Sequence, residues 1–228
     1  MRFKDISRAI RSPLNRFSAI KKIKRFHTHK ETIGDLVKTG MNLGSKGHYR
    51  VDSQQIPLEI ETLVNRVAAL NPRNILEIGT CNGGTFFMWA NLASNKAITC
   101  DLIGNENKIG LFEYFPKPGS GCKTVFIEGD SHTLDMKQKV KDQLAGEQVD
   151  FLFIDGDHSE KGVEMDYDMY HEFVRPGGII AFHDIIQNQP VEGNQVYYFW
   201  ERLKQKVKYE EVIGSEQQCG FGIGIIYV

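Results

Sequence analysis

The sequence predicts a doubly wound α/β domain on a mainly parallel, seven-stranded sheet, with a C-terminal antiparallel hairpin and an N-terminal helical arm. Short, nearly continuous apolar runs such as 151–154 and 179–182 are typical of strands that are buried on both faces. Between these runs lie longer segments whose apolar residues recur every three or four positions, as in amphipathic helices. Strands that alternate with helices in this way predict parallel pairing with helices on both faces of the sheet.

Turn-forming and helix-ending residues set the first and last residue of each expected helix and strand. The first helix of the domain, 56–70, has an apolar face and ends near Asn71 and Pro72, because proline cannot continue a helix. Further helices are expected at 83–94, 134–144, 160–174 and 194–207. Strands are expected at 74–79, 97–102, 124–128, 149–154 and 178–182, and the hairpin at 210–213 and 221–228.

The N-terminal region, 1–55, differs from the domain expected at 56–228. Residues 1–30 contain ten Lys or Arg residues and one acid, whereas the remainder holds 18 basic and 28 acidic residues. Apolar residues of this arm recur every three or four positions, which predicts an amphipathic helix that Pro13 breaks or begins. Such an arm can pack on the acidic body or a second subunit, or lie on an anionic membrane. The polar connector, 39–55, is expected to be a loop or lid with little core.

The composition is that of a globular protein. Hydrophobic residues make up 41% of the chain and charged residues 25%. No apolar run approaches the roughly 20 residues that a membrane-spanning helix needs. The four cysteines lack C-x-x-C spacing, which argues against a zinc site and fits a reducing cytosol. We therefore expect a cytoplasmic protein, with peripheral membrane contact through the arm as the alternative.

A glycine-rich loop follows the first strand. From Glu77 to Gly84 the chain reads Glu-Ile-Gly-Thr-Cys-Asn-Gly-Gly, so that Gly83 and Gly84 follow Gly79 with a G-x-x-x-G-G spacing. Neither the dinucleotide fingerprint G-x-G-x-x-G nor the phosphate-binding G-x-x-x-x-G-K-[ST] fits this loop. The Glu77 carboxylate suits a cofactor with a cationic amine better than one with a pyrophosphate. The loop predicts a cofactor site, since ligands of doubly wound sheets bind beyond the carboxyl ends of the strands.

Acidic residues also end the next two strands. Asp101 lies about 20 residues after the loop, where an acid can bind ribose hydroxyls. Asp130 and Ser131 follow the third strand. Each of these alone could be a turn residue or a helix cap. Together, at matching positions, they favour a cofactor that carries a ribose and a cationic group.

Four motifs follow one another between residues 55 and 185. They are Gln55-x-Pro57-x-Glu59, Ile75-Leu76-Glu77-Ile78-Gly79-Thr80 with Gly83-Gly84-Thr85, Ile154-Asp155-Gly156-Asp157-His158, and Arg175-Pro176-Gly177-Gly178 with His183-Asp184. This set resembles class I S-adenosylmethionine-dependent methyltransferases, within the group of sugar and macrolide O-methyltransferases and cephalosporin hydroxylase-like proteins. The resemblance implies a Rossmann-like methyltransferase fold and S-adenosylmethionine as cofactor. The site residues that it implies are Glu77, Gly79, Thr80, Gly83 and Gly84 at the methionine end, Asp101 at the ribose, and Asp130 and Ser131 by the adenine.

The fourth and fifth strands end in groups that could activate a hydroxyl. Asp155 and His158 follow the fourth strand and His183 and Asp184 end the fifth, so these side chains can converge. A hydroxyl becomes a better nucleophile when a base takes its proton or a divalent metal lowers its pKa. The resemblance implies Asp155 and Asp184 as ligands of Mg²⁺ or another divalent metal, and His158 as the base.

The metal-binding members of the family that the sequence resembles usually carry an acid at the position of His183. Two carboxylates and one imidazole make a weaker Mg²⁺ site and lean towards Mn²⁺, Fe²⁺ or Zn²⁺. We take His158 and Asp155 as candidate catalytic residues, and Asp155, His183 and Asp184 as candidate metal ligands. Without a metal, Asp157 would cap the next helix and His183 and Asp184 would form a hydrogen-bonded pair.

The favoured function is O-methylation of a hydroxyl on a small molecule, a sugar or a glycolipid. One alternative is a hydroxylase-like metalloenzyme on the same fold, and another is a non-catalytic cofactor-binding protein whose arm binds a partner. The acidic body argues against nucleic acid as acceptor, and a homo-oligomer is compatible with the arm. The aromatic cluster at 197–200 is expected to be core packing rather than an acceptor wall, and the loop at 104–121 could cover the site.

Overall fold

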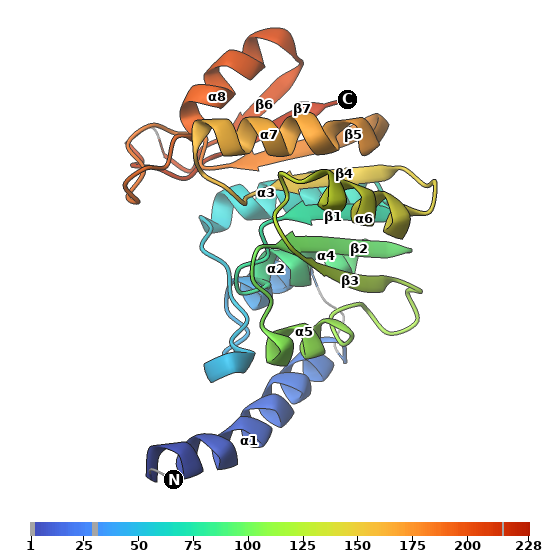
Figure 1. Ribbon diagram of the computed structural model, residues 1–228, viewed down its shortest axis with the longest axis vertical. Helices are drawn as coiled ribbons and strands as arrows, with labels where there is room; N and C mark the ends of the chain where they lie inside the picture. The colour runs from blue at the N-terminus through green and yellow to red at the C-terminus, as the bar shows by residue number, and fades with distance from the viewer. Residues whose placement is uncertain (1–2, 29–31, 216) are drawn as a thin grey trace.

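The computed structural model, which describes residues 3–28, 32–215 and 217–228, contains the predicted seven-stranded sheet (Figure 1). The strand order is β3-β2-β1-β4-β5-β7-β6, in which the first five strands are parallel and β7 is antiparallel to both β5 and β6. The strands are β1 (Asn74–Ile78), β2 (Lys96–Asp101), β3 (Lys123–Glu128), β4 (Val149–Ile154), β5 (Val174–His183), β6 (Tyr209–Val212) and β7 (Ile223–Tyr227). The expected doubly wound sheet with a C-terminal antiparallel hairpin is confirmed.

Helices cover both faces of the sheet, as the apolar strands require (Figure 1). One face packs against α3 (Pro57–Ala69) and α4 (Gly84–Leu92), and the other against α6 (Leu134–Leu144), α7 (Glu160–Tyr170) and α8 (Val196–Leu203). Strand β4 shows why both faces are apolar. Phe151 and Phe153 belong to the first core and Leu152 and Ile154 to the second, because successive side chains of a strand point to opposite faces.

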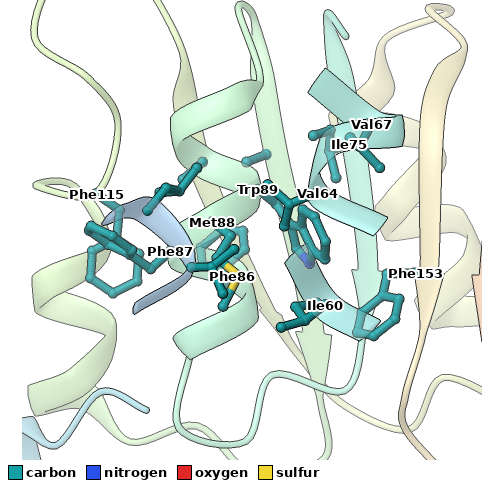
Figure 2. Packing of buried hydrophobic residues seen from close by; sticks show 14 of the residues in the cluster. Ile60, Val64, Val67, Ile75, Phe86, Phe87, Met88, Trp89, Phe115 and Phe153 are labelled. Carbon is teal, nitrogen blue, oxygen red and sulfur yellow. The ribbon is translucent and has the colours of Figure 1, made fainter. Parts of the chain in front are cut away.

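The first core is rich in aromatic rings (Figure 2). Trp89 of α4 is fully buried, and its ring centroid lies 4.8 Å from that of Phe151 and 5.5 Å from that of Phe153. Figure 2 shows Ile60 and Val64 of α3 beside Trp89, between the helices and the sheet. Edge-to-face contacts at these distances stabilise the packing beyond the area that they bury.

The loop between β2 and β3 folds back onto this core. It contains α5 (Glu106–Phe112), and Phe112 and Phe115 lie against the aromatic side chains of α4.

The N-terminal region forms three helical elements, α1 (Phe3–Phe26), α2 (Ile33–Met41) and the short η1 (Gly47–Tyr49). Figure 1 shows α1 extending away from the body. The C-terminal half of α1 packs on the body, since Ala19 and Ile23 are fully buried. Leu14 and Phe17, nearer its start, are 65% and 68% exposed. None of the described helices is both long and apolar enough to cross a membrane.

Two expectations for this region were wrong. Pro13 lies inside α1, which continues on both sides of it, so proline neither breaks nor begins this helix. The connector also contributes more core than its polar composition indicates, because Leu43, Tyr49 and Val51 are buried with the residues of α4. The arm residues 1, 2, 29 and 30 lie outside the described part of the chain.

Gly84 is where the connector contacts α4, and a side chain there is expected to destabilise the protein. The Gly84 N–H donates to the Asp52 carbonyl at 3.1 Å, and an added Cβ would lie 2.3 Å from the backbone of both Asp52 and Gly40. We expect Gly84→Ala to lower the free energy of unfolding by about 2–3 kcal/mol through overpacking. Gly110→Ala is the matched control, because a Cβ there meets nothing within 4 Å. Alanine in that helix should raise stability by about 0.5–1 kcal/mol in urea unfolding. Equal stabilities of the two variants would contradict this packing.

Candidate active site

A cavity of about 820 Å³ opens at the carboxyl ends of the parallel strands, within the usual size range of small-molecule sites. Its wall combines the loops after all five parallel strands with the end of the connector. The lining residues are Asp52, Ser53, Gln54, Gln55, Ile78, Gly79, Thr80, Cys81, Asn82, Thr85, Cys100, Asp101, Leu102, Gly129, Asp130, Ser131, His132, Asp155, Gly156, Asp157, His158, His183, Asp184, Gln189, Pro190, Val191, Asn194 and Phe221.

The glycine loop after β1 passes close to the end of β4. Gly79 has a φ of +97°, and an added Cβ would lie 2.0 Å from the Asp155 carbonyl oxygen, so only glycine fits there. Asp101 at the end of β2 stabilises this loop, because its Oδ2 accepts from the N–H groups of Thr80 at 3.0 Å and Cys81 at 2.8 Å. Of the predicted loop residues, Gly79 and Thr80 line the cavity, whereas Gly83 and Gly84 lie behind the wall.

Glu77 also lies beneath the wall and not on it. It is fully buried, and its carboxylate accepts from Trp89 Nε1 at 2.9 Å and from Thr99 Oγ1 at 2.7 Å. Burial raises the pKa of Glu77 to about 8, although hydrogen bonds from Thr85, Thr99 and Trp89 oppose the rise. In this structure Glu77 therefore joins β1, β2 and α4, directly under the glycine loop.

Sequence reasoning missed the connector residues of the wall. Gln55 donates from Nε2 to Asp155 Oδ2 at 3.1 Å, which joins the connector to the end of β4. Gln55 Oε1 and Ser53 Oγ are buried and have no hydrogen-bond partner among the described residues. Buried polar atoms that lack a protein partner are available to a ligand. The one sequence signal was the motif that contains Gln55, and it gave no indication of a contact with Asp155.

The predicted residues at the ends of β4 and β5 do converge. Asp155 Oδ1 lies 3.3 Å from His158 Nε2 and 3.2 Å from His183 Nδ1. Asp184 contacts the same two rings, with Oδ1 3.3 Å from His183 Nδ1 and Oδ2 3.6 Å from His158 Nδ1. His158 is the most open of the four, with 38% of its side chain exposed, whereas His183 is 5% exposed.

These contacts shift the ionisation of all four groups. Burial opposes the charge of His183, but the Asp155 and Asp184 carboxylates outweigh it and raise its pKa to about 9. The hydrogen bond to Asp155 raises the pKa of His158 as well. Burial works against the ionisation of Asp155, yet the two imidazoles hold its pKa far below the usual range. Burial raises the pKa of Asp184.

The same cluster has the donors of a metal site. Among the described residues, one ligand atom each from Asp155, His158 and Asp184 lie within 4.8 Å of one another. The sequence had pointed to His183 rather than His158 as the third ligand. His183 directs Nδ1 at both carboxylates, and its Nε2 is buried without a hydrogen-bond partner in the described chain.

The aromatic cluster and the loop at 104–121 lie away from the cavity wall. Phe199 and Trp200 of α8 are buried in the second core, whereas Tyr198 is 48% exposed. No residue of the loop lines the cavity, so the loop does not cover the site in this structure. Phe221, before β7, supplies an aromatic ring to the wall beside His183, with the two ring centroids 5.8 Å apart.

Comparison with known proteins agrees with this fold. Residues 76–185 match a family model described as a methyltransferase domain. An O-methyltransferase from Bacillus cereus, solved with SAH, shares 17% identity and superposes with a TM-score of 0.61 over 92% of this chain and 91% of that one. TomG from Streptomyces achromogenes, an O-methyltransferase solved with SAM, shares 16% identity with a TM-score of 0.57 over 88% and 92% of the two chains.

A third similar structure is MycE of the mycinamycin biosynthetic pathway, solved with Mg, SAH and mycinamycin VI. It shares 16% identity with a TM-score of 0.51, and the match covers 73% of this chain and 48% of that one. This chain therefore spans about half the length of MycE. These likenesses show the fold of the chain.

Proposed function

We propose that this chain, whose residues 76–185 match a methyltransferase domain, transfers the methyl group of S-adenosylmethionine to a hydroxyl oxygen of a small molecule, a sugar or a glycolipid. One observation carries this proposal. A single cavity joins a glycine loop with acids at the ends of β2 and β3 to a histidine held between two carboxylates at the ends of β4 and β5. The first part fits a ribose-bearing cofactor, and the second fits a base for a hydroxyl group.

The cofactor part of the cavity offers groups of the right chemistry. S-adenosylmethionine, when bound, supplies a methyl group on a cationic sulfur. Asp101 can accept from ribose hydroxyls, because within the described residues its Oδ1 has only one weak backbone contact, with Ile103 N at 3.5 Å. Ser53 Oγ and Gln55 Oε1 are buried polar atoms on the same wall that lack a partner in the described chain. Asp130 and Ser131 lie at the end of β3, beyond Asp101.

His158 is the candidate base. It lies on the cavity wall with one ring nitrogen near Asp155 and the other near Asp184. The neutral imidazole takes the proton of the acceptor hydroxyl as the oxygen forms its bond to the methyl carbon and the bond between that carbon and the cationic sulfur breaks. The two carboxylates then stabilise the imidazolium, which releases the proton to water after the reaction.

The donor set also fits a divalent metal. Asp155 and Asp184 would hold it through carboxylate oxygens, with the imidazole of His158 or His183 as a third donor. A metal there would lower the pKa of a hydroxyl group of the acceptor.

Thermal unfolding with S-adenosylmethionine or S-adenosylhomocysteine tests the proposal without knowledge of the acceptor. A ligand at about 100 times its Kd should stabilise the protein by about 2.7 kcal/mol, which is seen as a rise in Tm. Absence of a rise with both ligands would refute the cofactor assignment.

The same measurement with Mg²⁺, Mn²⁺ or a chelator tests the metal. We expect an added metal to raise Tm in the parent and not in Asp155→Asn. Asp135→Asn is the control, because Asp135 is 75% exposed on α6, away from the cavity. If neither metal nor chelator changes Tm, the metal site is refuted, and the cofactor assignment is unaffected.

A further inference from the structure

A buried carboxylate lies behind the wall at the β3 end of the cavity. Asp166 of α7 is fully buried and does not line the cavity. Its Oδ1 lies 3.2 Å from Nε2 of His132, which does line the cavity. In the described chain neither oxygen of Asp166 nor Nε2 of His132 has a hydrogen-bond partner, so the two groups meet as an ion pair. Because an isolated buried carboxylate is strongly unfavourable, His132 is the group that compensates its charge.

The loop that carries His132 is also held by α7. Tyr170, one turn after Asp166, is fully buried and donates from its hydroxyl to the Ser131 carbonyl at 2.7 Å. The His132 N–H donates to Asp130 Oδ1 at 2.9 Å. The second ring nitrogen, Nδ1, lies 3.7 Å from Asp130 Oδ1, too far for a good hydrogen bond. Nε2 of the imidazole thus faces Asp166, and Nδ1 lacks a close partner among the described residues.

We propose that His132 binds the adenine ring of the cofactor through a hydrogen bond from Nδ1–H to a ring nitrogen, and that Asp166 is the positioning residue that holds His132 in place. This inference rests on the proposed function. With the ribose at Asp101, the base of the cofactor extends towards the loop after β3, where His132 is on the wall. Adenine ring nitrogens without a substituent only accept hydrogen bonds, so a fixed donor recognises them.

The charges around His132 favour the form in which both ring nitrogens donate. The Asp166 carboxylate beside Nε2 raises the pKa of His132 against the effect of burial, and the charges of Asp130 and Asp157 add to the rise. These three carboxylates face the ring from α7, from its own loop and from the loop after β4. Cofactor affinity should therefore fall as the pH rises through the pKa of His132, because Nδ1 then loses its proton.

Calorimetric titration with S-adenosylhomocysteine tests the inference. We expect His132→Ala to weaken binding about tenfold, the contribution of one hydrogen bond. His132→Gln keeps a donor and should recover part of the affinity. Asp166→Asn should move the loss of affinity to lower pH, because the imidazole loses its buried anionic partner. His171→Ala is the matched control, since that ring is exposed at the end of α7 and does not line the cavity, and its affinity should stay within threefold of the parent.

The outcomes distinguish a failure of the proposed function from a failure of the inference about His132. If the parent does not bind S-adenosylhomocysteine, the proposed function fails. If the parent binds and His132→Ala binds equally well, His132 is not a cofactor-binding residue and the inference is overturned. An equal loss in His171→Ala would overturn it too, because the effect would then not depend on the imidazole that lines the cavity. If Asp166→Asn does not fold, the affinity of His132→Ala still tests the inference.

Discussion

His158→Ala is expected to lower kcat by about 10²–10⁴-fold, the usual contribution of a general base. The reason is the position of the ring, which lies on the cavity wall between Asp155 and Asp184 with 38% of the side chain exposed. Affinity for S-adenosylhomocysteine should stay within a few fold, because the residues proposed to bind the cofactor lie at the ends of β1, β2 and β3. The measurement is transfer of labelled methyl groups from S-adenosylmethionine to a panel of hydroxylated acceptors, beside calorimetric titration with S-adenosylhomocysteine.

His171→Ala is the matched control. That ring is exposed at the end of α7, where it stacks on Tyr167, and it does not line the cavity. The pH profile gives a second check. The base acts in its neutral form, so kcat/KM should rise with pH through the pKa of His158, which the hydrogen bond to Asp155 places above its usual value. A His158→Ala protein with parental kcat, or one that loses cofactor affinity in proportion to its activity, would contradict the role of His158 as base.

The fold could be predicted from the sequence because the burial of each strand and helix determines where its apolar residues fall along the chain. In β4, Phe151 and Phe153 meet one helical layer while Leu152 and Ile154 meet the other, so the strand reads as an unbroken apolar run. Pro13 shows the limit of local signals. Proline in a helix interior is normally unfavourable, yet α1 continues through Pro13, and its later turns are anchored by the buried Ala19 and Ile23.

The candidate site could be predicted where it depends on strand ends. Ile154 pairs with Phe182 in the β4–β5 ladder, so Asp155 and His183 must lie side by side whatever their neighbours are. The contact between Gln55 and Asp155 could not be predicted in this way, because 100 residues separate them and no strand register connects them. Asp166 carried no signal either, since an acid in a polar helix gives no indication that it faces the protein interior.

Glu77→Ala is expected to lower the free energy of unfolding by about 3–5 kcal/mol. The substitution leaves Trp89 Nε1 and Thr99 Oγ1 without their acceptor in a dry part of the core, at about 1–3 kcal/mol for each buried donor, and it adds a cavity. Glu77→Gln should be milder, because an amide oxygen can still accept from Trp89. Urea unfolding of the three proteins measures the series, and a Glu77→Ala protein as stable as the parent would refute these contacts.

The pH dependence of the same series separates a structural role of Glu77 from a cofactor-binding role. Burial raises the pKa of Glu77 in the folded protein to about 8 from a usual 4.5. The folded state then binds the proton more tightly than the unfolded state, so this stabilisation is present below pH 4.5 and is lost as the pH rises through 8. The stability of the parent relative to Glu77→Gln should therefore decline between about pH 5 and pH 8. A constant difference would mean that Trp89 and Thr99 keep the carboxylate ionised. If Glu77→Gln is stable but no longer binds S-adenosylhomocysteine, Glu77 acts on the cofactor despite its place beneath the cavity wall.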